Sequence, residues 1–167
     1  MHGANFLRHV WSHQPEGYHF VIYRGNGRWH ESCLSPQDIE DFGLIMPKTG
    51  DLYFAPNVFS EPIRQKQYCL PSRVMYQDLD EVSPEDCPLY PDLSWETSLG
   101  RYQGLWILDS VIEPVEFAGL NRGLNRACGA DPGTWNLTRV LRVPGSWNGK
   151  RGCRVSGARV KGLERVA

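Results

Sequence analysis

The stretch LPSRVMYQDLDE, residues 70–81, constrains the fold of this chain more than any other. Its β-prone residues 74–76 predict an extended strand, and two aspartates spaced by one residue close that strand. Side chains at positions i and i+2 of a strand project from the same face. Asp78 and Asp80 are therefore expected to point into one volume, about 6–7 Å apart along the backbone.

Two carboxylates this close repel each other unless a cation neutralises them. Oxygen ligands of this kind suit Mg²⁺ or Mn²⁺, which also take waters and substrate phosphates as ligands. Asp78 and Asp80 are therefore candidate metal ligands. The alternative is a strand that ends in a solvated acidic turn, because an aspartate pair with this spacing is by itself a weak motif.

The composition predicts a single globular domain. The chain has 167 residues, of which 41% are hydrophobic and 22% charged, enough to bury a sizeable core. No apolar run is long enough for a signal peptide or a membrane span. The five cysteines include no C-x-x-C pair, which argues against a disulfide framework or a cysteine zinc site. We therefore expect a cytoplasmic protein that has no membrane partner.

The net charge of −1 conceals a strong asymmetry along the chain. Seven acids and no Lys or Arg lie in 78–96, whereas 139–167 holds eight bases and one acid. An acidic metal-binding centre beside a basic flank suits a polyanionic ligand. For the residues after 150, a solvated basic tail remains the alternative.

The local patterns favour the α+β class, since hairpins and crossing helices alternate without repeats. The apolar face of one predicted helix, over 114–128, is expected to hold Phe117, Leu120, Leu124 and Ala127. The other predicted elements are a hairpin over 18–32 with its turn at 25–27, a short helix opening at 35–38, and strands over 50–55, 93–98, 102–109 and 138–143.

Two further stretches have the chemistry to meet a phosphate. The turn 98–103 carries a hydroxyl, a guanidinium and an amide, so Arg101 and exposed backbone amides could hold a triphosphate. Its alternative is an ordinary hairpin turn with one solvated arginine. In 136–150, Arg139 and Arg142 are expected on opposite faces of one strand. Glycine-rich nucleotide-binding patterns and the serine-hydrolase G-x-S-x-G are missing from the sequence.

Three stretches taken together, LPSRVMYQDLDE, ETSLGRYQGLW and GADPGTWNLTRVLRVPGSWNGK, resemble the primase-polymerase domain of plasmid and phage replication proteins. This is the RepB-like branch of the archaeo-eukaryotic primase superfamily. The resemblance implies an α+β primase fold, with an RNA-recognition-like antiparallel sheet, flanking helices and an N-terminal αβ unit. It divides the chain into a catalytic domain over 1–150, with a lead-in over 1–50 and a motif-bearing core over 51–150, and a basic tail over 151–167.

The same resemblance implies a DNA primase/polymerase that transfers nucleotides from (d)NTPs on a single-stranded DNA template with Mg²⁺ or Mn²⁺. Asp78 and Asp80 match the metal-binding pair of the first motif. Asn136 stands where the third motif normally supplies another metal-binding aspartate, so reduced activity is expected. Asp131 would compensate only if its loop folds back. The positions that match nucleotide- or template-binding residues are Arg73, Ser98, Arg101, Gln103, Arg139, Arg142, Asn148 and Lys150.

Two other functions remain open at this point. The uncharged Asn136 is compatible with a catalytically inactive module that binds nucleic acid or nucleotides during replication. A two-metal nuclease could use the same acidic pair. Domains of this kind often work beside a replicative helicase or a helical specificity domain, and either is a possible partner.

Overall fold

The computed structural model describes residues 1–35, 38 and 50–162. Helix α1 (Gly3–Trp11) precedes a long series of strands, and the second long helix, α3 (Pro114–Cys128), follows the longest strand. The strands are β1 (His19–Gly25), β2 (Arg28–Leu34), β3 (Leu52–Phe54), β4 (Ser72–Asp80), β5 (Leu93–Ser98), β6 (Arg101–Ile112), β7 (Leu141–Arg142), β8 (Trp147–Asn148), β9 (Cys153–Arg154) and β10 (Arg159–Val160). Single 3₁₀ turns cover Lys66–Tyr68 and Pro84–Asp86.

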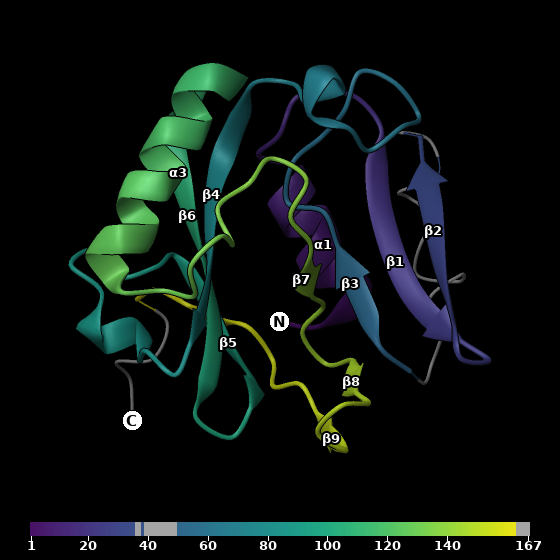
Figure 1. Ribbon diagram of the computed structural model, residues 1–167, viewed down its shortest axis with the longest axis vertical. Coiled ribbons are helices and arrows are strands. Elements are labelled where there is room, and N and C mark those ends of the chain that lie inside the picture. Colours follow the sequence, from purple (N-terminus) through teal and green to yellow (C-terminus); the bar gives the residue numbers. More distant parts are fainter. Residues whose placement is uncertain (36–37, 39–49, 163–167) are drawn as a thin grey trace.

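These strands form two antiparallel sheets and one small ribbon. The first sheet has the order β2-β1-β3-β7, the second has the order β10-β5-β6-β4, and β8 pairs with β9. Helix α3 covers the second sheet on one side, whereas β1 and β2 lie at the opposite side of the molecule (Figure 1). This arrangement confirms the predicted α+β class with an antiparallel sheet and an N-terminal helix-strand unit.

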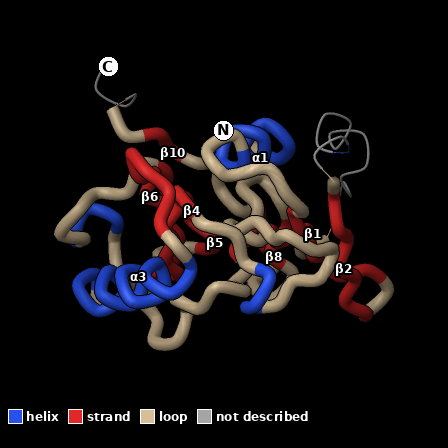
Figure 2. Tube along the Cα trace, turned by 90° about the horizontal axis from the view of Figure 1, so that it is seen from above, coloured by secondary structure: helices blue, strands red, loops and turns tan. Residues whose placement is uncertain are grey.

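Helix α1 joins the two sheets through aromatic contacts. Phe6 is fully buried, and its ring lies 5.3 Å from that of Phe54 on β3 and 5.1 Å from that of Trp95 on β5. Large apolar rings of this kind supply much of the burial energy of a small core. Seen from above, α1 and α3 lie apart, with strands β4, β5 and β6 of the second sheet between them (Figure 2).

The predicted hairpin over 18–32 is confirmed by the pairing of β1 with β2. Asn26 and Gly27 have φ angles of 50° and 74°, the left-handed pair that a two-residue hairpin turn requires. The strands predicted over 50–55, 93–98 and 102–109 are confirmed as well.

The predicted bounds of α3 are confirmed, and its predicted buried face is confirmed for Phe117 and Leu124 but wrong for Leu120 and Ala127. The buried residues are Phe117, Asn121, Asn125 and Cys128, while Leu120 is 44% exposed. The difference has a physical reason. Asn121 accepts a 3.2 Å hydrogen bond from the backbone amide of Tyr76, and Asn125 donates a 2.8 Å bond to Gln77. Amides that pair with β4 can be buried at little cost, so the inward face is polar and rotated.

Near the C-terminus the chain is less regular than predicted. The strand expected over 138–143 is reduced to β7, and residues 138–140 form a turn and an irregular segment. Residues 153–160 of the predicted basic tail contribute two short strands, and β10 pairs with β5.

The short helix predicted at 35–38 falls largely on residues outside the described ones. No helix in the described part of the chain is both long and apolar enough to cross a membrane.

Candidate active site

Asp78 and Asp80 lie at the end of β4, the edge strand of the second sheet. Gln77 and Leu79 are buried, whereas the two aspartates are partly exposed, so the alternation of a strand continues to its end. The pairing with β6 shifts register between the two aspartates, and Asp80 has a φ of 49°. A non-glycine residue in this left-handed region carries strain, which is common at functional sites.

Each aspartate forms an ion pair with an arginine from another element. The Arg139 guanidinium lies 2.8 Å from the Asp78 carboxylate, and Arg101, at the start of β6, pairs with Asp80. Arg101 also contacts Glu81 at 2.8 Å. The negative charge of Asp78 is close enough to help raise the pKa of Arg101. The structure therefore brings both carboxylates and both arginines into one partly exposed cluster.

The electrostatic environment of Asp78 leaves its charge incompletely compensated. Burial raises the pKa of this carboxyl, and the effect exceeds the opposing influence of Arg139 and a hydrogen bond from Gln103. The negative charge of Asp131 raises the pKa further. A carboxylate with this balance can accommodate an additional positive charge.

Gln103 connects this cluster to a buried ion pair behind it. It lies opposite Asp78 in the β4–β6 register, is 4% exposed, and accepts a 3.0 Å hydrogen bond from the Arg142 amide. The Arg142 side chain donates a 2.5 Å bond to Asp51, and its guanidinium lies 4.6 Å from the centroid of the Tyr53 ring. Arg142 therefore acts in the described structure as a buried support, engaged by Asp51 and Tyr53.

Asp51 is a site residue that the sequence patterns did not reveal. It is 8% exposed and also accepts a 2.9 Å hydrogen bond from the Gly149 amide, so it anchors the segment after β7. Its signal in the sequence is a single acid before the apolar strand 52–55. Only the fold brings Arg142 to it, across 91 residues of chain.

The loop between α3 and β7 places Asp131 beside the acidic pair, whereas the side chain of Asn136 bonds within the loop. The Asp131 amide donates a 3.0 Å hydrogen bond to the Asp78 carbonyl oxygen, so this loop does fold back onto β4. The exposed Asn136 side chain instead binds Gly133 and Thr138. Its backbone carbonyl accepts a 2.6 Å bond from the Tyr76 hydroxyl, which fixes the loop to the core.

The other predicted site residues are dispersed. Ser98 pairs with Arg101 at the β5–β6 turn and thus lies next to the cluster. Asn148 is buried and donates a 2.9 Å bond to the Thr97 carbonyl oxygen, a contact that holds the neighbouring chain segment. Lys150 is exposed two residues further on. Arg73 lies at the opposite end of β4, where its side chain donates a 2.9 Å bond to the Leu108 carbonyl oxygen.

The donor set at the end of β4 fits a hard divalent cation in its chemistry. Asp78 and Asp80 supply carboxylate oxygens, and Asp131 is exposed beside them. Both members of the pair are engaged by arginines, and no described group of three or more His, Cys, Asp or Glu side chains is arranged as a metal site. Each arginine engages one oxygen of its aspartate, so a cation at these carboxylates would compete with the arginines for them.

Comparisons with known proteins add information about the fold. No protein-family model matches the sequence, and no curated protein sequence matches it. The primase-polymerase (PrimPol) AEP domain of cyanophage S-2L superposes with a TM-score of 0.69 at 13% identity, covering 93% of this chain and 87% of that one. The catalytic domain of primase RepB′, solved in complex with initiator DNA, gives a TM-score of 0.58 at 17% identity, covering 91% and 81% of the two chains.

A second structure of primase RepB′ gives a TM-score of 0.58 at 16% identity and covers 95% of this chain but 55% of that one. Three solved structures of primase domains thus match almost the whole chain, although the sequences have diverged widely. The resemblance seen in the sequence is confirmed at the level of the fold. This chain therefore has the fold of the archaeo-eukaryotic primase domains.

Proposed function

We propose that this protein is a DNA primase/polymerase that transfers nucleotides from (d)NTPs to a growing strand on single-stranded DNA. The observation that supports this most directly is the cluster at the end of β4, where two aspartates face two arginines within a primase fold. Phosphoryl transfer requires carboxylates that bind divalent cations and, close to them, cationic groups such as guanidiniums that bind the phosphates.

The reaction needs few groups from the protein. A primer 3′-hydroxyl attacks the α-phosphorus of the nucleotide, the bond to the bridging oxygen breaks, and pyrophosphate leaves with that electron pair. The hydroxyl proton passes to water. Catalysis then depends on positioning and on stabilising the charge of the phosphates. Arg101 and Arg139 are the described residues placed to bind that charge.

Asp78 and Asp80 are proposed to hold Mg²⁺ or Mn²⁺. Such an ion lowers the pKa of a bound hydroxyl and stabilises the leaving group in phosphoryl transfer. A triphosphate offers Arg101 and Arg139 a more highly charged partner than a single carboxylate does. Nucleotide binding would therefore draw the arginines away and free the two carboxylates for cations.

Asp131 takes the part in this proposal that the sequence pattern assigned to Asn136. Its backbone is fixed to Asp78, and its charge acts on that carboxyl. A third carboxylate beside the pair offsets the repulsion between two cations, which the amide of Asn136 cannot do. With Asp131 in this position, the domain is expected to retain its activity.

The ion pairs themselves favour a second candidate function. Because both aspartates are already neutralised by arginines, the cluster is also compatible with an inactive module that binds nucleic acid during replication. Synthesis of new DNA distinguishes the two functions. The complex of the RepB′ catalytic domain with initiator DNA supports DNA as a ligand for either function.

The experiment is extension of a labelled primer on a single-stranded template with dNTPs and Mn²⁺. Wild-type protein is expected to extend the primer, and D78A/D80A is expected to have lost extension while keeping its thermal unfolding transition. Incubation without dNTPs tests for the nuclease, which would shorten the primer. A folded wild-type protein that neither extends nor shortens the primer contradicts the proposal and supports the binding module.

We further propose that residues 1–150 form the catalytic domain and that the protein works in the cytoplasm in plasmid or phage replication. The absence of a paired cysteine motif from the sequence is the basis for this compartment. A replicative helicase or a helical specificity domain is the proposed partner, and co-purification with the replication machinery tests it.

A further inference from the structure

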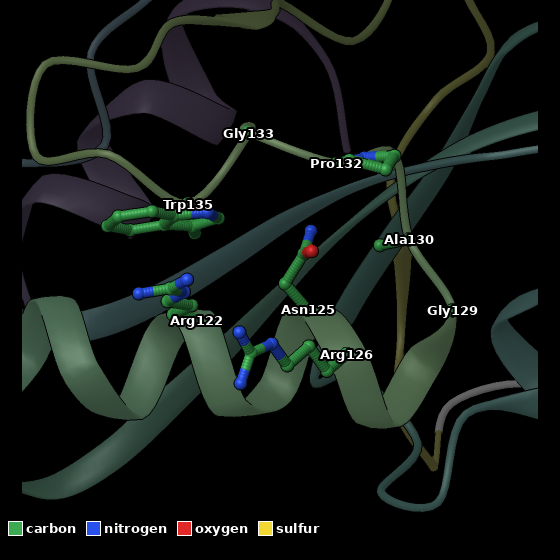
Figure 3. A pocket seen from close by; sticks show the side chains of 8 residues that line it. All are labelled: Arg122, Asn125, Arg126, Gly129, Ala130, Pro132, Gly133 and Trp135. Atoms are coloured by element: carbon green, nitrogen blue, oxygen red, sulfur yellow. The ribbon is translucent and has the colours of Figure 1, made fainter.

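A basic pocket lies on the side of β4 that faces away from the acidic pair. It has a volume of about 430 Å³ and is formed between α3 and the loop over 129–135 (Figure 3). Gln77 points to this side, where it binds Asn125, whereas its neighbour Asp78 points to the arginine cluster. The pocket and the candidate active site therefore share one strand and one loop but open on different sides of the sheet.

Two exposed arginines dominate the pocket. Arg122 and Arg126 are one helical turn apart on α3, so both project from the same face. Among the described residues, neither forms an ion pair with an acid. A basic residue in the last turn of a helix complements the helix dipole, which accounts for Arg126 alone. It does not account for a second arginine that lines the same pocket.

An aromatic ring completes the arrangement. The Arg122 guanidinium lies 5.2 Å from the centroid of the Trp135 ring, and Figure 3 shows the ring lying over this arginine. Trp135 is half-buried and lines the pocket. Guanidiniums that meet phosphates, beside a ring on which a base can stack, are the features of sites for single-stranded nucleic acid.

The walls of this pocket are held in place before any ligand arrives. The buried Asn125 donates bonds of 2.8 Å to Gln77, 3.1 Å to the Asp131 carbonyl oxygen and 3.2 Å to Thr134. Asn121 donates a 3.1 Å bond to the Trp135 carbonyl oxygen. A site that is already ordered loses less conformational entropy when it binds.

We propose that this pocket is a second subsite for single-stranded DNA, in which Arg122 and Arg126 contact backbone phosphates and Trp135 stacks on a base. The proposal rests on the proposed function for the identity of the ligand. It extends that function, because a strand bound here leaves the acidic cluster open to the nucleotide. The loop 129–135 contacts both sites, so the strand would be anchored close to the point of synthesis.

The test measures binding of fluorescein-labelled dT₂₀ by anisotropy in EDTA over a series of salt concentrations, so that no catalysis takes part. R122A/R126A is the pocket variant. R24A/R28A is the matched control, because it also removes two positive charges, and Arg24 likewise lies over a tryptophan ring, Trp29, at 5.7 Å. That hairpin is on the opposite side of the molecule from α3 (Figure 1).

Affinity falls as salt rises, and loss of two phosphate contacts is expected to make this dependence shallower: the magnitude of the slope of log affinity against log salt should decrease by about 1.4 for the pocket variant. W135L is expected to lose affinity by roughly tenfold at an unchanged slope, as for a lost base stack. Equal effects of R122A/R126A and R24A/R28A, or a wild type that does not bind dT₂₀, would overturn the proposal. A pocket variant that loses dTTP binding but keeps dT₂₀ binding would also overturn it.

Primer extension, measured separately, tells this proposal from the proposed function. If R122A/R126A weakens DNA binding but the wild-type protein does not extend a primer, the subsite is supported and the polymerase function is contradicted. If the wild-type protein extends a primer but R122A/R126A binds DNA normally, the polymerase function is supported and the subsite is contradicted. Thermal unfolding of each variant shows whether the helix and its loop remain intact.

Discussion

The backbone amide of Asp131 donates a 3.0 Å hydrogen bond to the carbonyl oxygen of Asp78. This one bond ties a loop that leaves α3 to the strand that carries the acidic pair. It places a third acid beside that pair, whereas the sequence resemblance assigned this position to Asn136. The predictions that follow depend on this placement and on the ion pairs around it.

Asp131→Asn is expected to lower primer extension by 10- to 100-fold, the range found when a group that supports metal ligands is lost. The acid side of the pH–rate profile should also move to lower pH. The reason is that the charge of Asp131 raises the pKa of Asp78, so its removal lowers that pKa. Extension rates measured from pH 5 to 8 test both effects.

Asn136→Asp is the matched control for that variant. The Asn136 side chain is exposed and binds Gly133 and Thr138, so a new carboxylate there is expected to leave extension unchanged. A steep gain of activity in N136D, together with no loss in D131N, would contradict this assignment. The third carboxylate would then belong at position 136 and not at Asp131.

Asp78→Asn should change stability in a pH-dependent manner. Burial raises the pKa of Asp78, so the folded protein binds this proton more tightly than the unfolded chain does. The ionised carboxylate therefore costs stability above its folded pKa, and the cost disappears as the pH falls toward the ordinary value of 3.8. The asparagine carries no such cost.

The free energy of unfolding of D78N, relative to wild type, is accordingly expected to rise with pH and to level off above the folded pKa. Urea unfolding at several pH values measures it. A relative stability that falls as the pH rises would mean that the Arg139 pair outweighs burial and that the pKa of Asp78 is depressed.

Asp80→Gly is expected to separate stability from activity. Asp80 has a φ of 49°, where glycine is favoured by about 1 kcal/mol, and its ion pair with Arg101 is partly exposed and worth little. The variant should therefore unfold at a free energy equal to or above that of wild type, while primer extension is lost. D109G, at an exposed position of β6 without a positive φ, should lose stability instead. Parallel destabilisation of both variants would contradict the assignment of strain to Asp80.

Arg142→Ala is expected to cost about 3–5 kcal/mol of stability, because it leaves the Asp51 carboxylate buried without its partner. The double variant D51A/R142A removes both charges and should lose less than the sum of the two single losses. Urea unfolding of the four proteins gives the coupling energy. Additive losses would mean that the two residues act independently.

Local sequence patterns were sufficient where local chemistry determines the structure. Asn26 and Gly27 specify the turn of the first hairpin, and Pro114 and Gly129 mark the ends of α3, where Gly129 has the left-handed conformation of a helix cap. The alternation through Asp78 and Asp80 placed both acids on the exposed face of β4.

The features that the sequence did not predict all depend on contacts between distant residues. The inward face of α3 is polar because Asn121 and Asn125 find partners on β4 and in the following loop. Asp51 becomes part of the site only through Arg142. Such pairings have no periodic signature, so apolar spacing finds Phe117 but misses the polar residues of the inward helix face, and it overlooks a buried acid.

Binding of Mn²⁺ is the sharpest test of the proposed active site, because it asks whether Asp78 and Asp80 hold cations without requiring the complete reaction. Mn²⁺ would be titrated into the protein in the presence of a dNTP and a primed template ending in a dideoxynucleotide, and free Mn²⁺ followed by electron paramagnetic resonance. We expect saturable binding by wild type that is lost in D78N/D80N, with a folded variant. Equal Mn²⁺ binding by the two proteins would mean that these aspartates are not the metal ligands.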